Sequence, residues 1–462
     1  MPIAGRRSRA RLGDTMRSPL HPKPKSLRGR RGPGSSSTAV AVPPQSLEHR
    51  ILLTATLCLL ALGAVMVYSA TSATTLLQGQ GNGSAYLIKF VSYGALGLIL
   101  MRVLARDGVA KVQSITPPLL VASFALVVAV HVPHIGVSVN GARRWIGPGA
   151  LQFQPSELLK LALVLYAATL LARRPQQVHD LRAIARPLLV VVGAACLLVA
   201  TEPDLGTAMV IAFTIAALLI ATGMPLQKLA LLAGIVLGLV FVYALARPYA
   251  RARLTSFMDP WAHAAGSGFQ AVQGQIAIGS GGLLGVGPGE SVQKIFYLPE
   301  APSDFILAVI AEELGVVGVC ALLSLYGLIA YAGLRAAKMA KSLYSALIAV
   351  GVTALIVSQA LLNVFAVLGL APLTGVTLPF VSYGSSSLVV MLAAMGLLLN
   401  VAAGGTAHVR AVAPSRTRSA DARAREPARW SRERSAEEDR DRRGRDRRAR
   451  GTGARGGGRA TG

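Results

Sequence analysis

Apolar runs of about twenty residues recur along the middle of this chain, separated by short polar segments. A helix needs about 20 apolar residues to cross a hydrocarbon core roughly 30 Å thick. The pattern therefore predicts an all-α polytopic membrane protein with about ten transmembrane helices and a membrane domain over residues 51–403. The predicted spans are 51–70, 85–102, 115–133, 155–172, 187–202, 205–222, 227–246, 304–332, 343–369 and 380–402.

Composition supports this class: 53% of the residues are hydrophobic and only 15% are charged, which excludes an ordinary soluble protein. Two tails, residues 1–50 and 404–462, each carry a net charge of +9 out of the total of +26. They contain few large apolar residues, so we expect them to be disordered. Their charge favours contact with anionic lipid at the cytoplasmic face, with a partner protein or nucleic acid as the alternatives. For the membrane domain we expect no nucleic-acid partner.

The distribution of Lys and Arg predicts the orientation, because basic residues collect in cytoplasmic loops. With both termini in the cytoplasm, the outer loops 71–84 and 370–379 carry no Lys or Arg. A large extracytoplasmic loop, residues 247–303, then lies between the seventh and eighth helices. Two outer segments depart from the rule, and their arginines are Arg143, Arg144, Arg247, Arg251 and Arg253.

These outward-facing arginines have two interpretations. Each could be an anchor at the membrane boundary. Guanidinium groups also bind phosphate through two parallel hydrogen bonds. Because two separate clusters fall on one face, the second interpretation predicts a site for an anionic, phosphorylated lipid in the outer leaflet.

Polar residues within the spans suggest a cavity. Glu157 and Lys160 lie three residues apart on one helix face, as a structural ion pair or as a cavity wall that helps to hold substrate. Ser382 and Tyr383 follow Pro379 at an irregular helix start, where they line a cavity or cap backbone groups. Asp204 either caps the next helix or has a functional role.

Asp304 is the candidate catalytic residue. It stands where the large polar loop meets the eighth span, so it either caps that helix or acts as a base beside the arginines. Glu312 and Glu313 follow on the same helix, and at most one of them shares the face of Asp304. The glycine-rich passage 279–289 lacks a nucleotide-loop pattern and is predicted to be flexible or re-entrant.

Several ordered motifs resemble the SEDS family of bacterial cell-wall polymerases (FtsW, RodA and SpoVE), which have ten transmembrane helices. They are NGARRWIGPG, QPSELLKL, EPDLGT, RLTSFMDPW, GFQAVQGQIAIGSGGLLGVG, YLPEAPSDFILAVIAEELG and LAPLTGVTLPFVSYGSSS. Together they extend over residues 51–403 and are highly specific. The motifs NGARRWIG and TLPFVSYG are more similar to those of the division branch, FtsW, than to those of the elongation branch, RodA. Ser385 departs from the family pattern, because it stands where the family usually has glycine.

The resemblance implies a peptidoglycan glycosyltransferase that polymerises lipid II and releases undecaprenyl pyrophosphate. It implies Asp304 as the catalytic carboxylate, with Gln275, the polar cavity and the outer arginines as substrate-binding residues. It also implies a class B penicillin-binding protein and other divisome proteins as partners, at the septum of the bacterial cytoplasmic membrane. Family activity responds to divalent cations such as Mg²⁺ or Mn²⁺, although no ligand cluster marks a metal site here. An elongation-type polymerase and a lipid II flippase are the alternatives.

Overall fold

The computed structural model of the chain describes residues 46–405 apart from 80–82, 140–141, 150–151, 175–180, 232, 235–237 and 239–247. These residues belong to one compact unit, Gln45–Gly462. The basic tails therefore lie almost wholly outside the described residues, and so do Arg247 and most of the predicted span 227–246.

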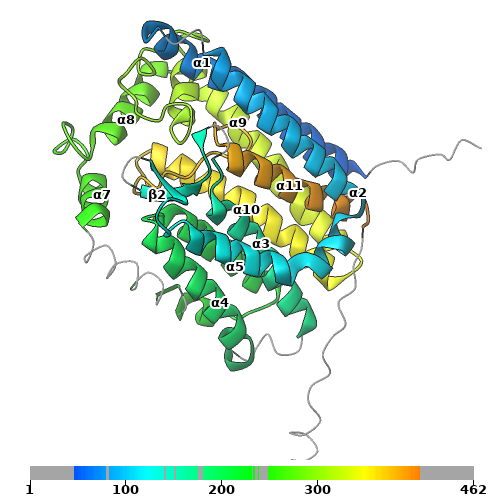
Figure 1. The fold of residues 1–462 in the computed structure, drawn as a ribbon. Helices are drawn as coiled ribbons and strands as arrows, with labels where there is room; N and C mark the ends of the chain where they lie inside the picture. Colours follow the sequence, from blue (N-terminus) through cyan, green and yellow to red (C-terminus); the bar gives the residue numbers. More distant parts are fainter. Residues whose placement is uncertain are drawn as a thin grey trace, which may run out of the picture. The chain divides into compact units, whose positions relative to one another are not determined.

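The described fold is helical apart from one short hairpin (Figure 1). Its elements are α1 (Leu47–Leu77), α2 (Ser84–Ala129), β1 (Gly136–Val139), β2 (Ala142–Ile146), α3 (Pro155–Arg173), α4 (Leu181–Thr201), α5 (Leu205–Ala221), α7 (Pro248–Met258), α8 (Phe269–Gly281), α9 (Ile306–Met339), α10 (Leu343–Val367) and α11 (Ser385–Ala402). Nine of the ten predicted spans fall on these helices. By length and composition, seven described helical segments can cross a membrane, and Pro187–Thr201 and Leu205–Ala221 are shorter apolar helices. The class of an all-α polytopic membrane protein is confirmed, while the count of ten stays a prediction.

The second and third predicted spans correspond to Ser84–Arg106 and Gly108–Ala129 of α2, and the connection between them is shorter than the sequence pattern predicts. Asn400 of α11 explains how the two spans join. Its side-chain amide donates to the carbonyls of Ala105 (2.9 Å) and Arg106 (2.7 Å), and its oxygen accepts from the Val109 amide (3.4 Å). A partner from a distant helix thus satisfies the backbone where the spans meet, which no local pattern could indicate.

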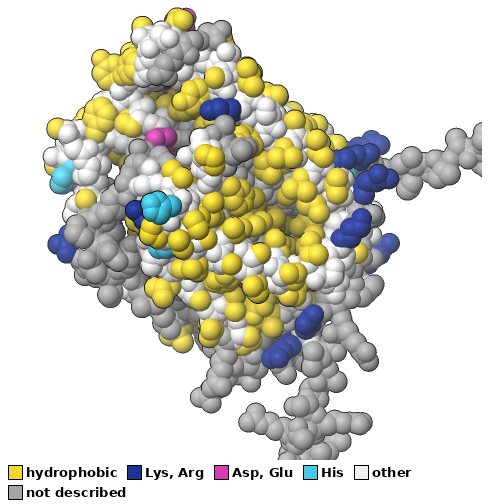
Figure 2. Space-filling view, viewed as in Figure 1, with side chains coloured by type: hydrophobic (Ala, Val, Ile, Leu, Met, Phe, Trp, Pro, Cys, Tyr) yellow, Lys and Arg dark blue, Asp and Glu magenta, His cyan; other side chains and the backbone are white. Residues whose placement is uncertain are grey.

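Helices α3 and α11 form the centre of the bundle. Their most apolar windows are 83% and 89% buried, against 22% for both windows of α2, which lies along α11 at the periphery (Figure 1). Apolar side chains of α2 such as Val91 and Ile99 are exposed. Figure 2 shows a broad hydrophobic surface with most of the visible Lys and Arg side chains along its edge. This pattern is that of a helix bundle surrounded by lipid.

The first and last described helices meet at one end of the bundle. The Ser46 hydroxyl donates to the carbonyl of Ala402 (2.7 Å), and Arg335 of α9 pairs with Glu48 of α1 (3.2 Å). Both ends of the membrane domain therefore lie on the same side, as an even number of spans requires. Which compartment this side faces stays a prediction.

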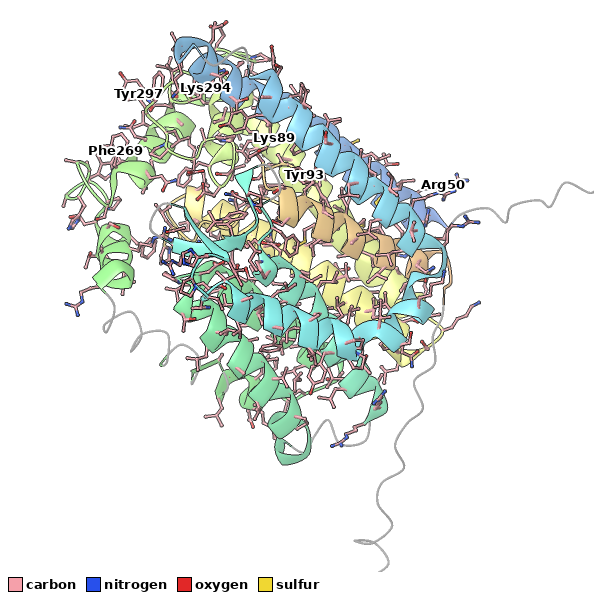
Figure 3. The ribbon with its side chains drawn as sticks, in the orientation of Figure 1. Arg50, Lys89, Tyr93, Phe269, Lys294 and Tyr297 are labelled. Atoms are coloured by element: carbon pink, nitrogen blue, oxygen red, sulfur yellow. The ribbon has the colours of Figure 1, made fainter. Side chains whose placement is uncertain are left out.

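The opposite end carries the segment between α7 and α9. Figure 3 shows Arg50 and Lys294 at opposite ends of α1. Arg335, near the C-terminal end of α9, pairs with Glu48, which lies close to Arg50 in the sequence. Asp304 precedes the opposite, N-terminal end of α9 and therefore lies far from Arg50. We call this end the Asp304 end.

The segment expected as one long loop is partly regular, since it contains α7 and α8. Its glycine-rich part is not a free loop either, because it pairs with a break in α9 at Gly315, whose φ is 64°. The backbone bonds across this break run from Val286 to Glu312 (2.9 Å), Gly287 to Glu313 (3.2 Å), Val316 to Gly282 (3.0 Å) and Val317 to Leu283 (3.2 Å). In this pairing, backbone groups of residues 282–287 bond those of residues 312–317 in place of helical partners. Local hydropathy does not indicate such an exchange of backbone hydrogen bonds.

Gly285→Ala should destabilise the protein markedly. Gly285 has φ 82°, and an added Cβ would lie 2.1 Å from the carbonyl oxygen of Glu313. Gly289 is the matched control, because its φ is 89° but no atom lies within 4 Å of its Cβ position. Both alanines carry the backbone strain of positive φ, of order 1–2 kcal/mol. Only Gly285→Ala adds a clash, so its thermal midpoint in detergent should fall further. Equal shifts would contradict this packing.

Candidate active site

The loop between α10 and α11, residues 368–384, organises the Asp304 end. Asn363 of α10 donates to the carbonyls of Asp304 (2.7 Å) and Val376 (2.8 Å), so it joins this loop to the start of α9. The Tyr383 amide adds a second link to the carbonyl of Pro302 (2.8 Å). We call residues 368–384 the α10–α11 loop.

Asp304 does not cap α9. The N-cap position belongs to Phe305, and no side chain caps this helix. Asp304 is half-buried as a residue, and its Oδ1 accepts from the Ser303 hydroxyl (3.3 Å). Its Oδ2 lies 3.8 Å from the position that a Cβ of Gly375 would take. The cap interpretation is therefore wrong, and the carboxylate borders the α10–α11 loop.

Burial is the main reason why the pKa of Asp304 rises from 3.8 to about 7. The nearby Glu300 carboxylate raises this pKa further. The Asp304 amide, the Ser303 hydroxyl and the Arg253 guanidinium act in the opposite direction. A carboxylate with a pKa near neutrality is suited to accept a proton during catalysis.

Arg144 extends from the β1–β2 hairpin toward Asp304 and the α10–α11 loop. Its Nη1 lies 3.9 Å from the Gly375 Cβ position, so Arg144 and Asp304 flank this glycine. Its Nε donates to the carbonyl of Glu202 (2.9 Å), and its Nη2 donates to the carbonyl of Pro203. Arg143 precedes it on β2 and is exposed.

Arg253 approaches from α7. Its Nη1 donates to the carbonyl of Leu373 in the α10–α11 loop (2.8 Å). Together with Gln275 of α8 it lines a cleft beside this loop, where the amide of Gln275 packs against Gly369. Arg251, on the same helix, is exposed, and Arg247 lies outside the described residues. Of the predicted arginines, the structure brings Arg144 and Arg253 to the loop.

Glu157 and Lys160 form a buried ion pair below the loop. Lys160 Nζ lies 3.0 Å and 2.9 Å from the two carboxylate oxygens and 2.6 Å from the side-chain oxygen of Gln359. The amide of Gln359 donates in turn to the carbonyl of Thr377 (3.0 Å). The pair is therefore connected to the α10–α11 loop through Gln359, and whether it also meets substrate stays a prediction.

The other predicted polar residues make backbone or aromatic contacts. The Ser382 hydroxyl accepts from the Leu378 amide (2.8 Å), as a capping group would. The ring of Tyr383 meets Tyr86 of α2 edge to face, with centroids 5.3 Å apart. Asp204 caps α5 by accepting from the amide of Thr207 (3.1 Å).

Glu312 and Glu313 anchor the segment 282–294, and their carboxylates bond residues other than Asp304. Glu313 pairs with buried Lys294 (2.8 Å) and accepts from Ser69 of α1 (2.6 Å), while Glu312 accepts from the Ser291 hydroxyl. Sequence reasoning missed Lys294, although it is a lone cation close to two unexplained carboxylates. Gly375 was also missed, because only its position between two charged groups reveals it.

The fold and the site define a multi-pass membrane protein with a carboxylate and two arginines gathered at one end of its bundle. A family model described as "Cell cycle protein", covering FtsW, RodA and SpoVE, matches residues 50–406, and the chain belongs to this family.

Named relatives agree with this membership. The chain is 42% identical over 352 residues to "Probable peptidoglycan glycosyltransferase FtsW" of Coxiella burnetii, which covers 75% of this chain and 94% of the relative. It is 38% identical over 352 residues to "Stage V sporulation protein E" of Bacillus subtilis, with coverages of 76% and 96%.

Solved structures show the same fold. A chain from "Structural coordination of polymerization and crosslinking by a peptidoglycan synthase complex" matches with a TM-score of 0.63 and 31% identity, over 76% of this chain and 96% of that one. Rod shape determining protein RodA of Thermus thermophilus matches with a TM-score of 0.56 and 31% identity, with coverages of 76% and 95%.

Proposed function

We propose that this protein is a peptidoglycan glycosyltransferase that polymerises lipid II into glycan strands for septal cell-wall synthesis. The observation that carries the proposal is the convergence of Asp304, Arg144 and Arg253 on the α10–α11 loop. Membership of a family whose relatives are named peptidoglycan glycosyltransferases supports it.

In the proposed reaction, a sugar hydroxyl of one lipid-linked chain attacks the anomeric carbon of another. Asp304 takes the hydroxyl proton as the new glycosidic C–O bond forms, and later releases it to water. The bond between the anomeric carbon and the pyrophosphate oxygen breaks, and undecaprenyl pyrophosphate leaves with the electron pair. A positioned base near its pKa and cations at the departing charge are what this transfer needs.

The arginines would hold the pyrophosphate. In the structure, Arg144 and Arg253 donate hydrogen bonds to backbone carbonyls, which are weaker acceptors than phosphate oxygens. We propose that both turn toward the pyrophosphate when substrate binds, while Gln275 contacts the substrate from the cleft beside Arg253. Exposed Arg143 and Arg251 would add long-range attraction for the anionic lipid.

The proposal extends to a divalent cation, Mg²⁺ or Mn²⁺. Within the described ranges, no three His, Cys, Asp or Glu side chains gather as a metal cluster. Mg²⁺ is usually held by one or two carboxylates together with substrate phosphates. The Ser303 hydroxyl lies 3.0 Å from Glu300 Oε2 and 3.3 Å from Asp304 Oδ1, so the two carboxylates are close together and fit such a donor set. The two carboxylates would hold the ion, which would neutralise charge on the leaving pyrophosphate.

We further propose a class B penicillin-binding protein and other divisome proteins as partners, with both termini in the cytoplasm. The solved synthase complex, described as coordinating polymerization and crosslinking, supports the first partner. The FtsW names of several relatives support the septal location. Lys and Arg in the loops at the Arg50 end support the orientation.

A reconstituted assay tests the function. The full chain, in liposomes with its penicillin-binding partner, should convert lipid II into glycan strands. A parallel assay of lipid II accessibility at the two membrane faces separates this activity from transport. Movement of lipid II without chain growth would reject the polymerase and favour a flippase.

A further inference from the structure

Glu202, in the turn between α4 and α5, is a buried carboxyl without a hydrogen-bond partner in the described part of the chain. Its side chain is 1% exposed, and neither of its oxygens is bonded. The Thr374 hydroxyl of the α10–α11 loop is also buried and unbonded. Native proteins pair most buried polar groups, so two unpaired ones beside a candidate active site call for an explanation.

Arg144 connects this turn to Gly375 and Asp304 of the candidate active site. Through Nε and Nη2 it bonds the carbonyls of Glu202 and Pro203, while its Nη1 lies beside Gly375 and Asp304. The charged groups that face Glu202 are Arg144 and Asp204. Asp204 is fully engaged, because it accepts from Thr207 and from the amide of Gln154.

The local field keeps Glu202 protonated. Burial, and then repulsion by Asp204, raise its pKa from 4.5 to about 8, and the Arg144 guanidinium opposes them. At neutral pH the carboxyl is therefore mainly neutral. A neutral carboxyl has an O–H group and can donate a hydrogen bond, which a carboxylate cannot do.

We propose that Glu202 is a further substrate-binding residue, whose protonated carboxyl donates a hydrogen bond to a phosphate oxygen held by Arg144. The inference rests on the proposed function, because it takes the ligand to be a lipid diphosphate. Arg144 exchanges the two backbone carbonyls for phosphate oxygens, which accept more strongly. That exchange opens the turn and lets the Glu202 O–H reach the same anion. An O–H donor beside a guanidinium matches the several acceptor oxygens of a diphosphate.

Binding of geranylgeranyl diphosphate to the purified full chain in detergent tests this proposal. Glu202→Leu removes the donor and should weaken binding about 10- to 100-fold. Its thermal midpoint should stay equal or rise, because an unpaired buried polar group is removed. Glu202→Gln keeps a donor and should bind within about threefold of wild type. Exposed Glu290→Gln is the matched control and should bind as wild type does.

If Glu202→Leu does not fold, the pH dependence of diphosphate binding by wild type and by Glu202→Gln tests the proposal instead. Wild-type affinity should fall above pH 8 as Glu202 loses its proton, whereas the affinity of Glu202→Gln should not. Unchanged binding by folded Glu202→Leu would overturn the proposal, and so would an equal loss in wild type and Glu202→Gln above pH 8. Failure of the proposed function has a different result: no glycan is made from lipid II, although diphosphate binding still depends on Glu202.

Discussion

Replacement of Asp304 by asparagine should abolish glycan synthesis while the protein remains folded. A general base contributes about 10²- to 10⁴-fold to a rate, so we expect a loss of at least about 100-fold in turnover. The fold should survive, because Asn363 bonds the backbone carbonyl of residue 304 and not its side chain. Polymerisation of lipid II by the reconstituted protein, with the thermal midpoint measured in parallel, checks both parts.

The sign of the pKa shift supports this expectation of stability. The pKa of Asp304 is about 7 in the folded protein, above its ordinary value of 3.8, so the folded state favours the neutral form. Stability that comes from the protonated group is present at low pH and is lost as pH rises through 7. Neutral asparagine should thus be at least as stable as ionised aspartate at pH 8. A folded Asp304→Asn variant with wild-type activity would remove the assignment.

The same pKa predicts the acid limb of the reaction. Without an added divalent cation, which would lower this pKa, turnover should fall about tenfold for each pH unit below 7, as Asp304 becomes protonated. Glu300→Gln is the matched control, because the Glu300 carboxylate raises this pKa. In that variant the limb should move to lower pH. A limb that stays in place would show that another group controls it.

How much of the fold and the candidate site could be predicted depends on how far apart in the sequence the interacting residues are. Span positions follow from local hydropathy, and Asp304 and the arginines follow from charge in otherwise apolar surroundings. The short connection between the two spans of α2 could not be predicted, because the side chain that bonds its backbone belongs to Asn400, nearly three hundred residues away. Glu202 was passed over for its neighbour Asp204, since only a structure shows which carboxylate is bonded.

Removal of one partner from the Glu157–Lys160 pair should destabilise the protein more than any other substitution considered. Lys160 is 1% exposed, and Glu157→Leu would leave its ammonium with only the side-chain oxygen of Gln359. An uncompensated buried charge costs about 3–5 kcal/mol, whereas an apolar replacement of both partners is often nearly neutral. The double variant Glu157→Leu/Lys160→Met should therefore regain most of the lost stability.

Activity of the double variant decides between the two interpretations of this pair. Both side chains are almost fully buried and bonded to each other, so we expect glycan synthesis to return together with the thermal midpoint. The remaining contact from Gln359 to Thr377 would still hold the α10–α11 loop beside Asp304. If the double variant is as stable as wild type but inactive, the pair contacts substrate, and the purely structural interpretation is wrong. Comparison with each single variant separates this result from simple unfolding.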